Sequence, residues 1–191
     1  MSHLLYIHGF LSSPTSLKAV QVRQWLSEHR ADIQYHCPSL TAYPEQTRQT
    51  LESIVEELLP EPVYIMGSSL GGFWATWLVE KYGLRAVLIN PAVKLEMFKA
   101  DYIDVELKNY HSDDTYILSE TDVKDLKAAD IKNIQYHNNY WLMVQTGDET
   151  LDYRFAVEKY ARCKQLVENG GDHSFQNFED KIADAIDFLF L

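Results

Sequence analysis

An apolar, strand-like run leads directly into the pattern G-x-S-x-G, formed by Gly67, Ser69 and Gly71. Ser69 is its centre, because Ser68 does not have glycine both two positions before and two positions after it. A serine on a sharp strand-to-helix turn has a strained backbone, and the flanking chain passes so close that a Cβ would clash. The helix predicted over Leu70–Tyr82 points its first amides at the place where an oxyanion would form. The pattern therefore predicts a nucleophilic serine.

A glycine-rich turn that merely contains a serine is the structural alternative, so the interpretation requires a base. Where a nucleophilic serine lies on a strand-to-helix turn of this kind, the acid and then the histidine follow it in chain order. His173 meets this requirement, since it lies in a Gly-Gly loop between the last predicted strand and the last helix. Its alternative is a histidine on a surface loop. The remaining histidines lie on early elements or within an irregular stretch: His3, His8, His29, His36, His111 and His137.

The acid is expected to end the strand before this loop. Asp148 comes directly after Gly147 at such a strand end, where its carboxylate can reach the second nitrogen of the histidine and fix its tautomer. Glu149 and Asp152 are the alternatives. Asp152 is better suited to cap the next helix, because Asp is a preferred N-cap residue.

A second oxyanion donor is expected after the first strand. His8 and Gly9 turn the chain there, so that the backbone amide of Phe10, or alternatively of Leu11, faces the site beside the amide of Leu70. For His8 itself we expect a structural role in bracing this loop, in preference to proton transfer.

Short apolar runs alternate with helical patterns, which predicts a mostly parallel sheet with helices on both faces. The predicted strands are His3–His8, Ile33–Cys37, Val63–Met66, Ala86–Asn90, Trp141–Thr146 and Lys164–Val167. The predicted helices are about Ser16–His29, Glu45–Leu59, Leu70–Tyr82, Tyr153–Ala161 and Asn177–Phe190. The last carries a core-facing stripe at helical spacing: Phe178, Ile182, Ala185, Ile186 and Leu189.

The stretch between Pro91 and Tyr140 interrupts this alternation, because it lacks a clear buried strand and is rich in Asp, Lys and Tyr. One interpretation is a solvated helical excursion. The other is a small cap-like insertion at about 93–140 whose aromatic residues shape an acyl pocket: Tyr102, Tyr110, Tyr116 and Tyr136.

Composition limits the class of protein. The 191 residues, 46% of them apolar, fit a single domain over 1–191 with a sizeable core. A formal net charge of −11 argues against nucleic acid or an anionic membrane as a partner. No apolar run is long enough to cross a membrane, and the N-terminus does not resemble a signal peptide. Cys37 and Cys163 are expected to be buried or partly buried thiols of a cytoplasmic protein.

The chain resembles a short α/β-hydrolase and is similar to the bacterial YqiA-like esterase family over nearly its whole length. The segments that carry the resemblance are Ile7 to Pro14, Gly67 to Gly72, Gln145 to Glu149 and Gly171 to Phe175. The resemblance implies a three-layer sandwich, a cytoplasmic carboxylesterase-like enzyme, and Ser69, Asp148 and His173 in the triad positions. Because the first strand begins at residue 3, the antiparallel strands that usually open the sheet are missing, and about six strands should remain.

The expected reaction is two-step acyl transfer from Ser69 to water, with no metal and no organic cofactor. A small chain with a reduced cap favours short-chain acyl esters as substrates. Two alternatives stay open: a thioesterase or other acyl or carbon–carbon hydrolase with the same triad, and a non-catalytic ligand-binding member of the fold. The sequence leaves the oligomeric state open.

Overall fold

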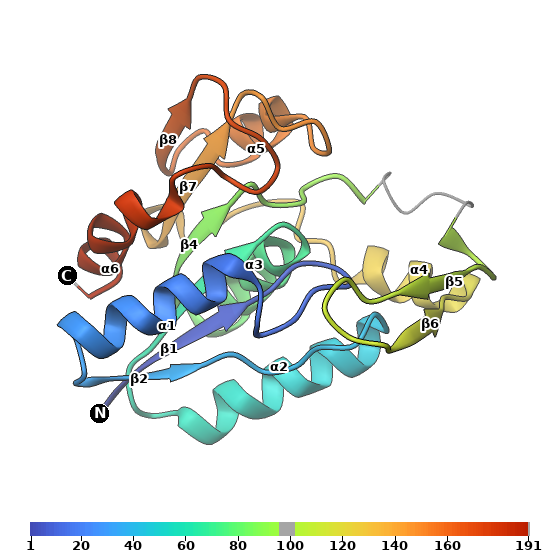
Figure 1. Cartoon of the computed structure of the whole chain (residues 1–191), viewed down its shortest axis with the longest axis horizontal. Helices are drawn as coiled ribbons and strands as arrows, with labels where there is room; N and C mark the ends of the chain where they lie inside the picture. Colours follow the sequence, from blue (N-terminus) through green and yellow to red (C-terminus); the bar gives the residue numbers. More distant parts are fainter. Residues whose placement is uncertain (96–101, 191) are drawn as a thin grey trace.

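The computed structural model describes residues 1–95 and 102–190 (Figure 1). Within these residues a six-stranded parallel sheet has the order β2-β1-β3-β4-β7-β8. The strands are β1 Ser2–Ile7, β2 Ile33–His36, β3 Val63–Ser68, β4 Arg85–Ile89, β7 Tyr140–Gln145 and β8 Lys164–Glu168. The predicted fold class is confirmed, and each predicted strand is present with its ends within two residues of the predicted ones.

The two faces of the sheet follow from the alternation of side chains along each strand. In β1, Leu4 and Tyr6 belong to one buried cluster, whereas Leu5 and Ile7 belong to the other. Because both faces are covered, the central strands are apolar at nearly every position.

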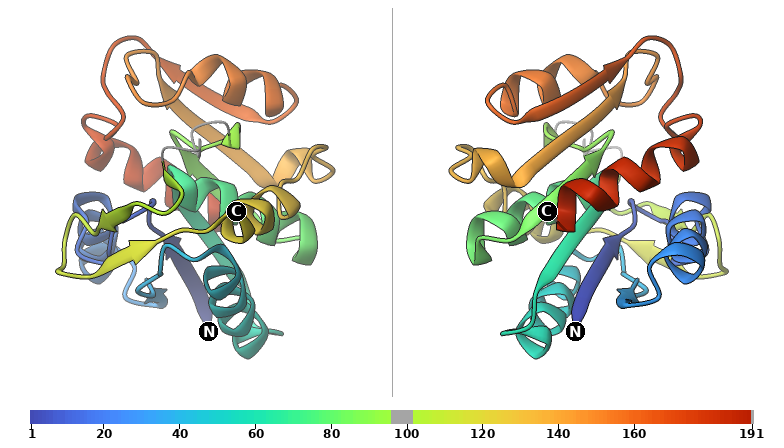
Figure 2. Two further views of the ribbon diagram at one scale, coloured as in Figure 1. Left: turned by 90° about the vertical axis from the view of Figure 1, so that its right-hand side faces the viewer. Right: turned by 90° about the vertical axis from the view of Figure 1, so that its left-hand side faces the viewer.

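Helices cover both faces of the sheet (Figure 2). α1 (Leu17–His29) and α6 (Ile182–Phe190) pack on the face of Leu4 and Tyr6. The opposite face is covered by α2 (Pro44–Leu58), α3 (Leu70–Tyr82) and α5 (Tyr153–Lys159). The C-terminal stripe is buried as predicted, although its helix begins as the 3₁₀ turn η4 (Phe178–Lys181).

The stretch after β4 holds a small hairpin and a helix beyond the carboxyl ends of the strands, at the right of Figure 1. The hairpin pairs β5 (Glu106–Lys108) with β6 (Thr115–Ile117), and α4 (Glu120–Ala128) follows. Ser119 and Asp122 form a capping box that starts α4. A 3₁₀ turn, η3 (His137–Asn139), then leads into β7.

Strand register brings the carboxyl ends of three strands together. Ile7 of β1 pairs with Gly67 of β3, and Ser68 pairs with Ile89 of β4. The loops after these strands therefore leave the sheet side by side, the usual place for a ligand site in a parallel sheet. Among the described residues, no helix is long and apolar enough to cross a membrane.

Candidate active site

Ser69 lies on the turn between β3 and α3 with φ 55° and ψ −122°, a conformation that non-glycine residues rarely adopt. Its amide donates to the carbonyl of Ile89 over 3.0 Å, and its carbonyl accepts from the amides of Gly72 and Ala92, both over 2.9 Å. These backbone bonds hold the strained residue in place from both sides.

The two flanking glycines are required by close backbone contacts. A Cβ on Gly67 would lie 2.4 Å from the carbonyl oxygen of Gly71. One on Gly71 would lie 2.0 Å from the carbonyl oxygen of Ile7. Neither contact can be relieved by a side-chain rotation, so the turn has the geometry of a nucleophile elbow.

The structure brings Ser69, His173 and Asp148 into one hydrogen-bonded chain. His173 Nε2 lies 3.1 Å from Ser69 Oγ, and His173 Nδ1 lies 3.0 and 2.9 Å from the two carboxylate oxygens of Asp148. The Asp148 side chain is 1% exposed and that of His173 24%. A carboxylate can only accept here, so Nδ1 carries the proton and Nε2 can accept the proton of the serine hydroxyl.

The other two candidate carboxylates have different partners. Glu149 Oε2 accepts from the backbone amide of His173 over 3.1 Å. Asp152 is the N-cap of α5 and accepts from the Arg154 amide, as expected. Asp148 Oδ1 also accepts from the amides of Thr150 and Leu151, which orient its carboxylate.

Two buried amide side chains that the sequence analysis did not identify hold the histidine loop. Asn90, just after β4, donates from Nδ2 to the carbonyls of Asp172 and His173, over 3.0 and 3.2 Å. Gln145, at the end of β7, accepts at Oε1 from the amides of Asp172 and Gln176 and donates from Nε2 to the Gln176 carbonyl. The sequence signal for Asn90 and Gln145 is that each is a polar residue at the end of an otherwise apolar strand.

Lys18 is a third residue that the sequence analysis missed. From the first turn of α1, its ammonium donates to the carbonyl of Ser174 over 2.6 Å. Burial lowers the pKa of Lys18 to about 8, while the nearby carboxylates of Asp172 and Asp148 act in the opposite direction. The ammonium group of Lys18 therefore lies close to the carboxylates of Asp172 and Asp148.

The loop after β1 passes directly beside Ser69. A Cβ on Gly9 would lie 3.2 Å from Ser69 Cβ and 3.7 Å from Ser69 Oγ, so the chain leading into Phe10 borders the serine. Leu70 is the first residue of α3, and its amide therefore has no acceptor within the helix. Both amides predicted to bind an oxyanion thus belong to segments that adjoin Ser69.

His8 has the bracing role expected from the sequence. Its Nδ1 donates to the carbonyl of Gly9 over 2.9 Å, and its Nε2 accepts from the amide of Leu40 over 3.2 Å. Burial lowers the pKa of His8, which favours the neutral ring that this pair of bonds requires.

A cavity lies beside the elbow, between α3, α4 and the start of α2. It is lined by Phe10, Thr41, Ala42, Pro44, Thr47, Leu70, Trp74, Leu118, Asp122, Val123 and Leu126. The four tyrosines expected to shape an acyl pocket are not among these residues. Tyr102 contacts Phe10 edge-on and Tyr116 contacts Tyr43, while Tyr110 is exposed and Tyr136 lies near Gly83. On the side of α4, the cavity is bordered by the aliphatic side chains of Val123 and Leu126.

The cysteines and acidic residues suggest no further chemistry. Cys37 and Cys163 are unpaired and half-buried, and burial raises the pKa of each thiol to about 11. Over residues 1–95 and 102–190, no three His, Cys, Asp or Glu side chains are grouped so that they could hold a metal ion.

Comparison with known sequences gives a match to a family model over residues 3–190, described as "Uncharacterised protein family (UPF0227)". A UPF0227 protein of Serratia proteamaculans is 24% identical over 182 residues, covering 91% of each chain. A UPF0227 protein of Shewanella woodyi is 33% identical over 94 residues, which is 46% of this chain and half of that protein's length.

Comparison with solved structures gives the same fold. The mouse alpha/beta hydrolase domain-containing protein 10 superposes with a TM-score of 0.74 at 16% identity, covering 97% of this chain and 89% of the other. A monoacylglycerol lipase of Paleococcus ferrophilus superposes with a TM-score of 0.70 at 14% identity, covering 96% and 91%. At these identities the likeness shows the α/β-hydrolase fold alone.

Proposed function

We propose that this chain, which belongs to the uncharacterised protein family UPF0227, is a serine hydrolase of small carboxylic esters. One observation carries the proposal, namely the hydrogen-bonded chain from Ser69 through His173 to Asp148. Ser69 Oγ lies 3.1 Å from His173 Nε2, and His173 Nδ1 lies 2.9 to 3.0 Å from the carboxylate oxygens of Asp148. The buried carboxylate orients the imidazole so that its second nitrogen faces a strained serine. A protein that only binds a ligand has no need of this arrangement.

The reaction follows from these positions. His173 removes the proton of Ser69 as Oγ attacks the ester carbonyl, and Asp148 stabilises the imidazolium that forms. The amides of Phe10 and Leu70 donate to the oxyanion of the tetrahedral intermediate. His173 then protonates the leaving alcohol, and an acyl-enzyme remains on Ser69. Water, activated by the same histidine, releases the acid and restores the serine.

The experiment that tests this function compares p-nitrophenyl acetate hydrolysis by the wild type, Ser69→Ala and Ser68→Ala. Ser68 is the matched control, because it is the neighbouring serine at the end of β3. We expect Ser69→Ala to lower kcat by about 10⁴-fold or more, and Ser68→Ala to stay within a few-fold of the wild type.

A fluorophosphonate probe gives an independent readout, because it labels an activated serine regardless of the substrate. Labelling should occur at Ser69 in the folded wild type and disappear in Ser69→Ala. Hydrolysis retained by Ser69→Ala, or a wild type that neither turns over esters nor takes up the probe, would overturn the proposal. Parallel assays with acyl thioesters compare the two substrate classes for the same serine.

A further inference from the structure

We infer that the cavity between α3, α4 and the start of α2 binds the acyl chain of the substrate, and that Leu126 limits this chain to short unbranched groups such as acetyl and propionyl. The inference rests on the proposed function, because it concerns the acyl half of an ester bound at Ser69. It adds the substrate class and the residue that selects it.

The position of the cavity assigns it to the acyl half. It is bordered by Phe10 and Leu70, whose amides we place at the carbonyl oxygen of the ester. The leaving alcohol must lie beside His173, which protonates it. None of the described residues that line the cavity comes from the loops of His173 or Asp148. An ester held between these groups therefore directs its alcohol towards His173 and its acyl chain into the cavity.

The lining favours an apolar, uncharged chain. Most of its side chains are aliphatic or aromatic, and its polar members are already bonded to the protein. Thr47 Oγ1 donates to the Thr41 carbonyl over 2.9 Å, and the Asp122 carboxylate accepts from the amide and hydroxyl of Ser119. Since the described lining residues include no Lys or Arg, an acyl group that ends in a carboxylate would lack a counter-ion and would face Asp122.

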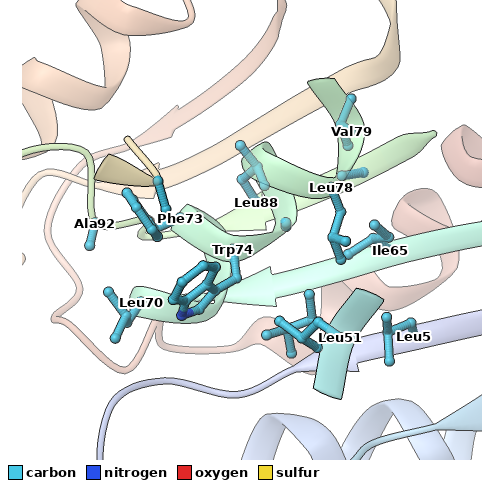
Figure 3. Close-up of a cluster of buried hydrophobic side chains, with 14 of the residues drawn as sticks. Leu5, Leu51, Ile65, Leu70, Phe73, Trp74, Leu78, Val79, Leu88 and Ala92 are labelled. Carbon is cyan, nitrogen blue, oxygen red and sulfur yellow. The ribbon is translucent and has the colours of Figure 1, made fainter. Parts of the chain in front are cut away.

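The size of the cavity favours a short chain. The cavity has a volume of about 20 Å³, which accommodates one or two water-sized groups. Trp74 of α3 bounds it and is 2% exposed; Figure 3 shows its ring beside Leu70. Leu126 of α4 is also 2% exposed. A longer chain would have to displace one of these buried side chains.

The place of the leaving alcohol differs from the buried acyl cavity, because it lies beside His173, whose side chain is 24% exposed. A leaving group there projects towards solvent and meets few constraints. The enzyme should therefore discriminate strongly between acyl groups and weakly between alcohols.

The test is the chain-length profile of Leu126→Ala on p-nitrophenyl acetate, butyrate and octanoate. Truncating Leu126 opens room for two more methylene groups, so the ratio of kcat/KM for butyrate to that for acetate should rise by about 10-fold over the wild type. Leu189→Ala is the matched control, since Leu189 is fully buried on the opposite face of the sheet. It should lower stability similarly and leave the ratio unchanged.

Ala42→Val tests the same cavity in the opposite direction by adding two methyl groups to its lining. It should lower the ratio of butyrate to acetate hydrolysis several-fold, and it removes no core packing. The inference is wrong if both variants fold, require Ser69 for activity and keep the ratio within twofold of the wild type. In that outcome the proposed function stands. A wild type that hydrolyses no ester and takes up no fluorophosphonate would overturn both.

Discussion

The side-chain amide of Asn90 holds the backbone of His173, donating to its carbonyl over 3.2 Å and to that of Asp172 over 3.0 Å. The same side chain accepts from the amide of Gln145 over 3.0 Å. Asn90 is 3% exposed, so a single buried residue connects β4, β7 and the loop that carries the proposed base. The position of His173 over Ser69 is therefore set from beneath by the sheet.

Asn90→Ala should lower kcat for p-nitrophenyl acetate by about 100-fold, because a displacement of the imidazole by about 1 Å costs this much. KM should change far less, since Asn90 does not line the cavity. The matched control is Asn139→Ala, whose Nδ2 donates to the carbonyls of Gly83 and Leu84 at the opposite end of the sheet. Both variants should lose about 1 to 3 kcal/mol of stability to urea. Equal kcat values for the two would contradict a positioning role for Asn90.

Asp148→Asn should lower kcat by about 10⁴-fold while leaving the fold intact, since an amide no longer enforces the Nδ1–H tautomer of His173. Asp152→Asn is the control, because Asp152 caps α5 and pairs with Arg154. It should cost about 1 kcal/mol of stability at most and little activity. Steady-state kinetics with thermal melts separates the two effects, and a large loss of kcat in Asp152→Asn would reverse the assignment.

Gly9→Ala and Gly71→Ala should fail in different ways. The Gly71 variant places a Cβ 2.0 Å from a backbone oxygen of β1, so little soluble folded protein is expected. The Gly9 variant meets Ser69 Cβ at 3.2 Å, a contact that small shifts can absorb. It should fold, with a lowered kcat, because the shift moves the nucleophile relative to the Phe10 amide. Soluble yield, circular dichroism and kcat distinguish the outcomes, and a well-folded Gly71→Ala would be inconsistent with the packing described.

Lys18 should make stability depend on pH in the alkaline range. Its pKa is about 8 in the fold and about 10.4 in an unfolded chain. Between these values the unfolded chain binds more protons, so stability rises with pH. From pH 7 to pH 9.5 the free energy of unfolding of the wild type should rise by about 1 to 2 kcal/mol relative to that of Lys18→Met.

The comparison uses urea unfolding at both pH values and Lys181→Met as a control, since Lys181 pairs with Glu168 at the surface. Glu168 raises the pKa of Lys181, so this lysine stays charged over the whole interval. Its variant should differ from the wild type by the same amount at pH 7 and pH 9.5. If the stability difference between Lys18→Met and the wild type is also the same at pH 7 and pH 9.5, then the fold does not lower the pKa of Lys18.

The sequence was most informative where a residue's neighbours in the chain determine its surroundings. The glycines around Ser69 report contacts within the elbow itself, and α3 spans Leu70–Tyr82 as predicted. The position of Asp148 directly after a glycine at a predicted strand end distinguishes it from Glu149 and Asp152. The structure places its carboxylate on His173.

Residues whose partners lie far away in the chain could not be predicted in this way. Asn90 and Gln145 bond to backbone groups of a distant loop, and nothing in their local sequence identifies those partners. The strands β5 and β6 have three residues each and are largely exposed, so they lack the apolar pattern of a buried strand. One of the two interpretations of this stretch places its tyrosines at an acyl pocket, whereas Tyr110 is 76% exposed.

The capping box of Ser119 and Asp122 has a consequence for how such a protein can diverge. It satisfies the first backbone amides of α4 with side chains of α4 and its own cap, so these amides need no hydrogen-bond partner from the sheet. The residues of the proposed triad, in contrast, lie at strand ends that are joined by backbone contacts. Substitutions on the inner face of α4 can therefore accumulate without altering the reaction machinery. A combinatorial library at Val123 and Leu126 of α4 should yield many folded catalysts with different substrate ranges.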